Sequence, residues 1–239
     1  MPHPLRLLLL SALAVVLAGA CADAEQGASS PASTSAATPT SPPASPTTPP
    51  SPEPTAPETP SGPQASDGTP QDALLTIPAL GIDRLAVEAY EGWTDDAPGT
   101  AIQDGGIAAS PYGARGGTGP GGIGNYQVTA HRLSSTRAFE FLGDLEVGDE
   151  VRVEAGGVAY TYALTTTRQT SFRSESSLAE QRAAVPGQPG VTPTQAMITL
   201  STCRTTEDHA EGNYWSDEFD NPEHRIDKIG VLVRAEALP

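Results

Sequence analysis

The sequence predicts one all-β domain, a barrel or sandwich of short strands, behind a long N-terminal segment that cannot fold. Residues 22–72 hold 13 prolines and no aromatic residue, Val, Leu or Ile, so they bury too little apolar surface to offset chain entropy. Residues 73–239 are enough for one ordinary domain, but not for two. There, short apolar runs alternate with Gly, Pro and Asp, which is typical of an all-β protein with short helices and long loops.

The N-terminus predicts export. After Arg6 the first 20 residues are almost wholly apolar, but about 14 apolar residues are too few to span a bilayer. The small residues before Cys21 resemble a bacterial lipoprotein signal, although Ala18 stands where a branched apolar residue is usual. Alternatively, an ordinary signal is cleaved near Ala20 and leaves Cys21 as a free thiol. We expect a signal peptide at 1–20, a lipidated Cys21, a disordered tether over 21–72 and a domain over 73–239 that works outside the cytoplasm.

The charge balance excludes a nucleic-acid-binding protein. The chain has a net charge of −16, of which −11 lies in residues 73–239, and a polyanion does not neutralise phosphates. The sequence has no G-x-G-x-x-G, no P-loop, no internal repeat and no paired-cysteine metal pattern. We therefore expect no cofactor and no metal.

The domain is expected to begin with two strands, 73–77 and 85–89, joined by a turn at Pro78–Gly81. Residues 92–124 are rich in Gly and Pro, so we expect loops with brief extended pieces. Clean alternation then predicts a strand over 126–131.

The second half continues the pattern of short strands. Further strands are expected at 149–154, 158–167, 197–201 and 229–234, and short helical segments at 137–142 and 176–184. Gly156 and Gly157 lie between the first two of these strands and predict a hairpin.

Three residues at the ends of expected strands can carry chemistry. Cys203 follows the apolar run 197–201, His131 closes an earlier strand, and Arg225 opens the last one. A thiolate is a nucleophile, an imidazolium can protonate an amine leaving group, and a guanidinium can brace an oxyanion. The trio therefore points to acyl transfer. The plain alternative is a buried structural cysteine with an ordinary surface His and Arg.

Two motifs surround the candidate cysteine and histidine. Residues 199–203 read T-L-S-T-C, and residues 125–132 read N-Y-Q-V-T-A-H-R. They resemble the T-L-x-T-C and N-x-x-x-x-G-H-R motifs of sortases, cysteine transpeptidases of Gram-positive cell surfaces, with Ala130 in place of Gly. Further resemblances are the I-P-x-L-G opening within 75–81, the L-x-x-G-D turn at 145–149 and a segment at 185–193 like that of class E of actinobacteria. Together they cover about 75–234.

The resemblance implies an eight-stranded sortase-like β-barrel in which His131, Cys203 and Arg225 occupy the catalytic places. Arg204 adjoins the cysteine and Arg234 lies near the chain end, so both match the family arginine less well. Cys203 would attack the Thr–Gly bond of an LPxTG-like or LAxTG-like sorting signal and form a thioacyl enzyme. The acceptor would be a peptidoglycan cross-bridge or a pilin amine.

Residues 207–223 form a distinctive acidic segment with seven acids and no Lys or Arg. It is interpreted as a surface loop, as a lid whose aromatic residues contact the peptide, or as a cation site. His209 and His224 flank it and rival His131, but neither follows a strand. The candidate substrate-binding residues are Thr202, Arg204, Tyr214 and Trp215.

Two rival functions stay open. An L,D-transpeptidase has His two residues before its cysteine, where this chain has Ser201. A non-catalytic lipoprotein that binds a surface ligand would keep Cys203 buried and unreactive. We expect a lipid-anchored enzyme on the extracellular face of the cytoplasmic membrane of a Gram-positive bacterium. Its expected partners are sorting-signal peptides and an acceptor amine.

Overall fold

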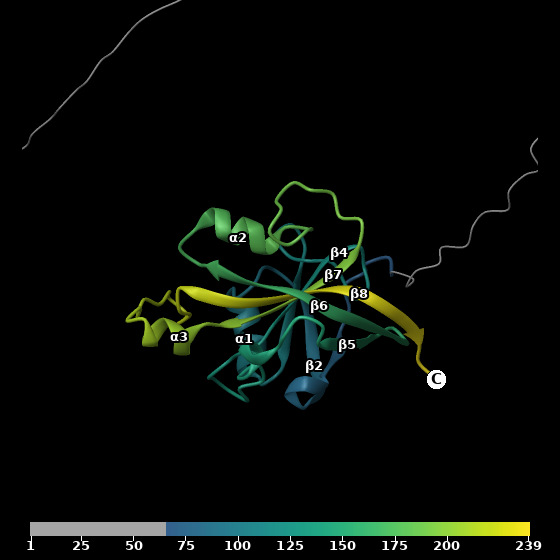
Figure 1. Cartoon of the computed structure of the whole chain (residues 1–239), viewed down its shortest axis with the longest axis horizontal. Coiled ribbons are helices and arrows are strands. Elements are labelled where there is room, and N and C mark those ends of the chain that lie inside the picture. Colours follow the sequence, from purple (N-terminus) through teal and green to yellow (C-terminus); the bar gives the residue numbers. More distant parts are fainter. Residues whose placement is uncertain (1–65) are drawn as a thin grey trace, which may run out of the picture. The chain divides into compact units, whose positions relative to one another are not determined.

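Eight strands form a closed barrel in the computed structural model, which describes residues 66–239 (Figure 1). The strands are β1 (Ala73–Ile77), β2 (Ile82–Glu91), β3 (Ala108–Tyr112), β4 (Gly124–Thr129), β5 (Glu150–Ala155), β6 (Val158–Ser171), β7 (Ala196–Cys203) and β8 (His224–Ala237). They are hydrogen-bonded in the order β1-β2-β3-β4-β7-β8-β6-β5, and β5 pairs with β1 to close the barrel. The prediction of an eight-stranded all-β barrel is confirmed. The predicted signal peptide, Cys21 and most of the tether lie outside the described residues.

Two of the strand pairs are parallel, and this determines which strand ends lie together at one edge of the barrel. β2 pairs parallel with β3, and β4 with β7, whereas the other neighbours are antiparallel. Parallel strands end at the same edge of a sheet. The carboxyl ends of β4 and β7 therefore lie next to each other. The long strands β6 and β8 cross in front of them (Figure 1).

The barrel interior is filled by apolar side chains at alternate strand positions. Tyr126 and Val128 of β4 pack with Ile198 and Leu200 of β7 in the core. The side chains at the alternate positions, such as Ser201 next to Leu200, project to the outer face because successive strand residues alternate. Ser201 is nevertheless buried, so the outer face is covered at this place.

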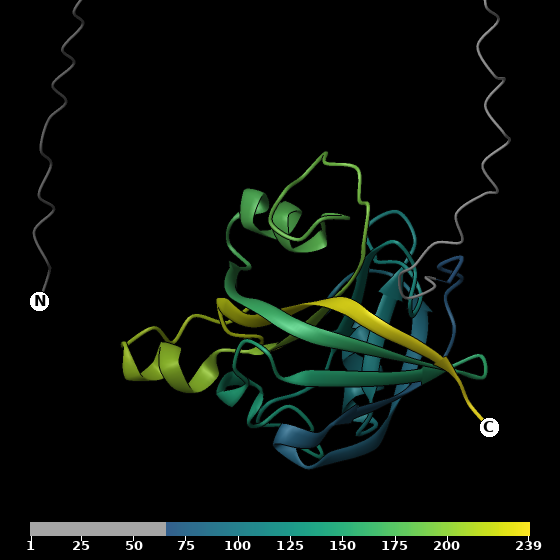
Figure 2. The same cartoon turned by 45° about the vertical axis from the view of Figure 1, so that its right-hand side comes forward.

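Within residues 66–239, three α-helices lie outside the barrel: α1 (Ala97–Asp104), α2 (Glu175–Arg182) and α3 (Thr205–Ala210), with 3-10 turns η1 (Pro78–Leu80) and η2 (Leu142–Asp144). The helix predicted at 176–184 is confirmed as α2. η2 lies at the end of the helical turn predicted at 137–142. Figure 2 shows α2 and the segment after it above β6 and β8, and α3 projecting to one side.

The prediction of loops over 92–124 is wrong for α1. The Asp96 side chain caps this helix by accepting a hydrogen bond from the Gly99 N–H at 2.9 Å, and Pro98 occupies its first turn, where no N–H is needed. β3 is one of the extended pieces expected there. The acidic segment is likewise not only a loop, because α3 forms at its start.

Residues 66–72, which the sequence assigns to the tether, contact the barrel. Ser66 N–H donates to the Gly121 carbonyl at 2.8 Å, and the Asp72 carboxylate accepts from the Ala89 N–H at 2.9 Å. Part of the predicted tether therefore belongs to the folded domain.

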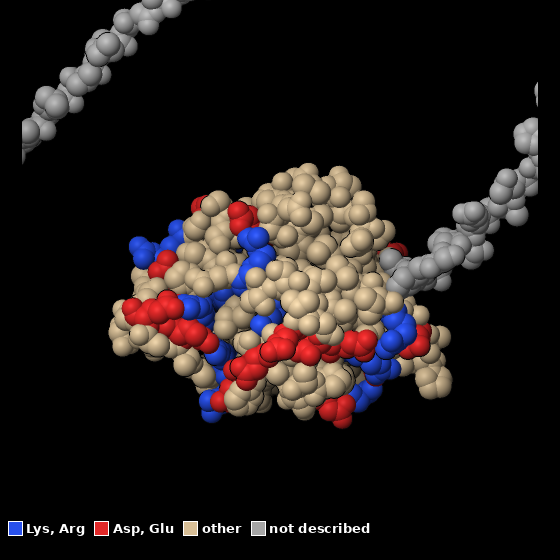
Figure 3. All heavy atoms as spheres, viewed as in Figure 1, with Lys and Arg blue, Asp and Glu red and all other residues tan. Residues whose placement is uncertain are grey.

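The surface of the described residues is strongly acidic in places. Acidic side chains cover α3 and continue as a band across the face shown in Figure 3. This face repels polyanions, in line with the exclusion of nucleic acid. In residues 66–239 no helix is long and apolar enough to cross a membrane.

Candidate active site

The parallel pairing of β4 with β7 brings His131 and Cys203 to one edge of the barrel. Thr129 is the register partner of Ser201. His131 and Cys203 each lie two residues further along the chain. The two side chains that the sequence predicted to meet are therefore at the same level of neighbouring strands.

Arg225 completes this arrangement from the other side of β7. Cys203, the last residue of β7, is the register partner of Arg225, the second residue of β8. Directly opposite residues of an antiparallel pair project from the same face. The structure thus assembles the predicted trio of His131, Cys203 and Arg225 at one end of the barrel.

The Arg225 guanidinium is fully buried and held on three sides. Nε donates to the Asp95 carboxylate at 2.6 Å, and Nη1 donates to the Pro222 carbonyl at 3.1 Å and the His224 carbonyl at 3.3 Å. The Phe172 ring centroid lies 3.9 Å from the guanidinium carbon. Nη2 is buried and has no partner in the described part of the chain. The hydrogen-bonding capacity of this nitrogen is therefore not used within residues 66–239.

Asp95 is a site residue that sequence reasoning missed. It is buried beneath the trio, and Gln103 of α1 donates to its second carboxylate oxygen at 2.9 Å. Its φ is +57°, a conformation that Asp tolerates better than most residues. Asp95 and Phe172 come from loops that only the folded chain brings to Arg225, so no local pattern could have identified them.

Burial raises the pKa of the Cys203 thiol above its usual value. The positive charges of Arg225 and Arg132 oppose this rise, while the negative charges of Asp95 and Asp217 add to it. A neutral thiol is a poor nucleophile, so attack needs a group that takes its proton.

His131 follows the neighbouring strand end and contacts α1. Its Nε2 lies 2.9 Å from the carboxylate of Asp104, at the end of α1, and Asp104 is 65 % exposed. When Nε2–H donates to this carboxylate, Nδ1 is the nitrogen left to exchange a proton.

Arg132, the residue after His131, ties the two strand ends together. Its Nη1 donates to the Cys203 carbonyl at 3.3 Å, and its Nη2 donates to Glu207 of α3 at 2.8 Å. The hydrogen bond with Arg132 lowers the pKa of Glu207. Arg132 therefore links α3 to the end of the cysteine strand.

Buried polar contacts fasten α2 across the outer face of β4, β7 and β8. Gln181 of α2 donates to Asp227 at 2.9 Å, and Asn125 donates to the Gln181 carbonyl at 3.0 Å. Ser201 also donates to Asp227, at 2.6 Å. Burial raises the pKa of Asp227 despite these hydrogen bonds.

Two of the four predicted substrate-binding side chains are engaged within the protein. Thr202 is buried, and its hydroxyl donates to the Ala130 carbonyl at 2.8 Å. Arg204 donates to Asp208 at 2.8 Å and to Glu211 at 2.5 Å. Any contact of these two with a peptide stays a prediction.

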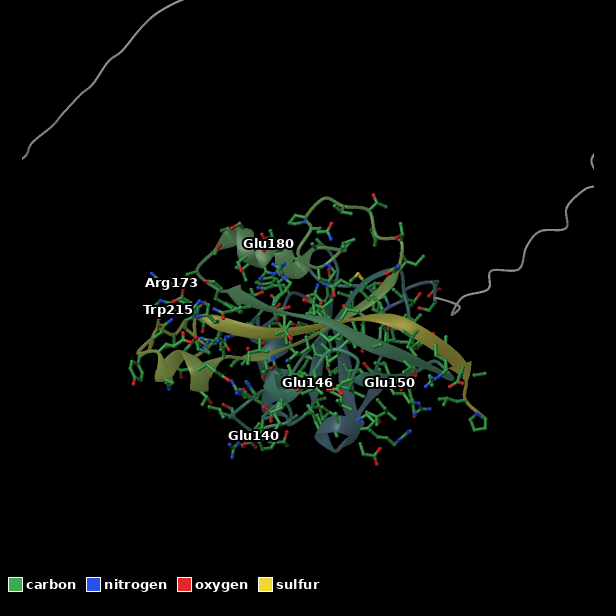
Figure 4. All side chains as sticks on the ribbon, viewed as in Figure 1. Glu140, Glu146, Glu150, Arg173, Glu180 and Trp215 are labelled. Atoms are coloured by element: carbon green, nitrogen blue, oxygen red, sulfur yellow. The ribbon has the colours of Figure 1, made fainter. Side chains whose placement is uncertain are left out.

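The other two lie on the acidic segment. Tyr214 is 72 % exposed and stacks on His209, with ring centroids 4.8 Å apart. Trp215 lies beside Arg173, whose guanidinium is 5.7 Å from its ring centroid (Figure 4). The segment is anchored by Asp208, which accepts from the His224 N–H at 3.1 Å. Residues 66–239 contain no group of three His, Cys, Asp or Glu side chains that could hold a metal ion.

A cavity of about 560 Å³, called the side cavity here, lies next to Arg225. Asp95 and Phe172, which both contact Arg225, are part of its wall. The remaining wall comes from the loop before α1, Arg115, one face of α2 and residues 217–219.

Comparison with known proteins identifies the family. A family model described as the Sortase domain matches residues 75–215. The SrtA sortase from Actinomyces oris is 19% identical with a TM-score of 0.54, over 74% of this chain and 89% of that one. Sortase E from Streptomyces avermitilis is 22% identical with a TM-score of 0.50, over 72% of this chain and 93% of that one. Sortase E1 from Streptomyces coelicolor is 22% identical with a TM-score of 0.51, over 73% and 94%. No curated protein matches the sequence.

Proposed function

Because this chain belongs to the sortase family, we propose that it is a cysteine transpeptidase that cleaves a sorting signal at a Thr–Gly bond and joins the new acyl end to an amine. Cys203 is the nucleophile, His131 the general acid and base, and Arg225 the hydrogen-bond donor. The observation that carries the proposal is the register pairing of Cys203 with Arg225 next to the strand end that bears His131.

The geometry supports a two-step reaction. The Cys203 thiolate adds to the threonine carbonyl, and the oxyanion accepts a hydrogen bond from Arg225 Nη2. Collapse of this intermediate breaks the C–N bond, and His131 gives its proton to the glycine amine that leaves. An incoming amine then loses a proton to His131, attacks the thioester and expels the thiolate.

The reaction is tested with the purified chain, a library of sorting peptides and a primary amine. We expect mass spectrometry to detect cleavage between Thr and Gly and an amide product that contains the amine. Cys203→Ala is the control and should yield neither. If no library peptide were cleaved while Cys203 stayed reactive toward an alkylating reagent, the transpeptidase assignment would be wrong.

The signal and the acceptor are finer parts of the same proposal. An LPxTG-like signal and a peptidoglycan or pilin amine follow from the resemblance to sortases, and an LAxTG-like signal follows from the resemblance to class E at residues 185–193. The same library distinguishes the two signals, because they differ in the second residue. A preference for neither would remove the class E assignment.

The location is proposed from the first residues of the chain. A short apolar segment followed by small residues and Cys21 supports export and lipidation, which would hold the enzyme at the extracellular face of the membrane. Cys21→Ser should release the enzyme into the medium or leave an unprocessed precursor. Unchanged membrane retention with normal processing would rule out a role for Cys21.

A further inference from the structure

Two arginines near the candidate active site lack a carboxylate partner. Every arginine in residues 66–239 forms an ion pair with Asp or Glu except Arg115 and Arg182. Both of these line the side cavity. Acids outnumber bases in this domain, so two cations left unpaired in one cavity are not explained by a shortage of carboxylates.

Arg182 has an unused hydrogen-bond donor. The residue is partly buried at the end of α2, and its Nε is buried without a partner among the described residues. Burial and the positive charge of Arg115 lower the pKa of Arg182. Glu175 and Asp95 are close enough to offset this in part, but neither forms an ion pair with it. An arginine stays charged in such surroundings, so the two like charges face each other.

Arg115 is exposed, but an aromatic contact holds it. Its guanidinium carbon lies 3.5 Å from the centroid of the Trp93 ring, which is also part of the cavity wall. Such stacking stabilises one position of the guanidinium and leaves its N–H edge free for another partner.

We propose that Arg115 and Arg182, called the arginine pair here, bind a carboxylate of the peptide substrates. Guanidinium groups match carboxylates with two parallel hydrogen bonds. The pair shares the side cavity with Asp95 and Phe172, the neighbours of Arg225, so the bound carboxylate lies on the Arg225 side of the candidate active site. The inference rests on the proposed function, because carboxylates are the anions that unmodified peptides carry.

Acidic side chains that line the same cavity limit the kind of ligand that it can bind. Six acids line it. Asp95 is paired with Arg225 and Asp96 caps α1, whereas the other four form no ion pair with the arginine pair and repel a second negative charge: Glu91, Glu175, Asp217 and Glu218. A single carboxylate therefore fits better than a polyanion. It belongs either to an acidic residue of the sorting signal or to the molecule that bears the acceptor amine.

The first experiment separates these two sources. Single-turnover acylation is measured with Leu-Pro-x-Thr-Gly peptides that place one Glu, or its neutral isostere Gln, at each position around the cleaved bond. Aminolysis of the thioacyl enzyme is measured with glycine and with glycinamide. A carboxylate preference of about tenfold or more in one of the two steps identifies the source. It should disappear in Arg182→Gln and Arg115→Gln, while the control Arg234→Gln, at the remote end of β8, should keep it.

Two outcomes would overturn the inference without contradicting the proposed transpeptidase function. One is formation of the thioacyl enzyme at equal rates from Glu and Gln peptides, with equal rates of aminolysis by glycine and glycinamide. The other is a carboxylate preference that persists in both arginine variants. Failure of every peptide to acylate Cys203 is a different result and would count against the proposed function.

The second experiment needs no activity. In the full chain, the arginine Nε–H resonances are followed by NMR during titration with acetate, acetamide or inorganic phosphate. Acetate should shift the resonances of Arg115 and Arg182 at lower concentration than those of Arg234, and acetamide should shift none. Equal response of all three arginines to acetate, or a response to phosphate alone, would overturn a carboxylate subsite.

Discussion

Cys203, at the end of β7, and Arg225, near the start of β8, are cross-strand partners on one face of the barrel. Two of the three guanidinium nitrogens of Arg225 are already occupied, Nε by Asp95 and Nη1 by backbone carbonyls. Nη2 has no partner among residues 66–239. The arginine is therefore expected to donate through a single nitrogen.

The first prediction concerns the shape of the Arg225 side chain. A lysine at this position keeps the charge but cannot contact Asp95, the backbone carbonyls and the substrate together. Arg225→Lys should slow single-turnover acylation by about 10²–10³, as loss of an oxyanion donor does. Arg225→Ala is the companion variant. If the lysine variant were acylated at nearly the wild-type rate, Arg225 would contribute only its positive charge.

The second prediction concerns Asp95, which positions Arg225. Asp95→Asn should preserve the backbone conformation, because Asn tolerates positive φ. It should weaken the interaction that positions the Arg225 guanidinium. Acylation should fall by roughly tenfold or more, while alkylation of Cys203 at neutral pH becomes faster because a charge that raises the thiol pKa is removed.

Asp220→Asn is the matched control for Asp95→Asn. Asp220 also has a positive φ, of +58°, but makes no side-chain contact with Arg225. It should change neither rate. If Asp95→Asn changed the rates of acylation and alkylation in the same direction, Asp95 would act directly on the thiol and not through Arg225.

The third prediction is the pH dependence of the thiol. Because burial raises the pKa of Cys203, the rate of alkylation should rise with pH to a midpoint above the usual value of about 8.5. Asp217→Asn should shift that midpoint to lower pH, since the negative charge of Asp217 adds to the rise. The Asn side chain can still accept from the N–H groups of Phe219 and Asn221. A midpoint at or below the usual value would show that partial burial of Cys203 does not raise the pKa of its thiol.

The fourth prediction concerns where the domain begins. A chain that starts at residue 73 loses the hydrogen bonds of Ser66 and Asp72 with the barrel. Its melting temperature should be several degrees lower than that of a chain starting at residue 66, since 1 kcal/mol corresponds to about 2–4 °C at this size. The chain that starts at residue 66 should have the same melting temperature as the full chain. Equal melting of both truncated chains would show that these contacts are not stabilising.

The strands and the trio could be predicted because their signals are local. Alternation in β4 fixes which side chains face the core, and an apolar run that stops at Cys203 places the thiol at a strand end. The parallel pairing of β4 with β7 brings His131 beside it, but this pairing was not predicted from the residues themselves. The family motifs added the choice of Arg225 over other arginines.

The surroundings of the trio could not be predicted in this way. The first turn of α1 contains Pro98 and Gly99, a composition typical of a loop, and the cap by Asp96 is a weak signal on its own. Asp95 reaches Arg225 across 130 positions of sequence. Contacts of that kind depend on how loops pack on the finished barrel, and a single sequence carries no periodicity that reports them.

The measurement that tests the account most directly is mass spectrometry of the acyl-enzyme. The purified chain is mixed with a reactive sorting peptide, quenched in acid within one turnover and digested. The account predicts an adduct with the mass of the peptide's acyl part on the fragment that contains Cys203, absent in Cys203→Ala and removed by an added amine with formation of an amide. Turnover of the same peptide without an adduct on Cys203, or with an equal adduct in Cys203→Ala, would contradict it.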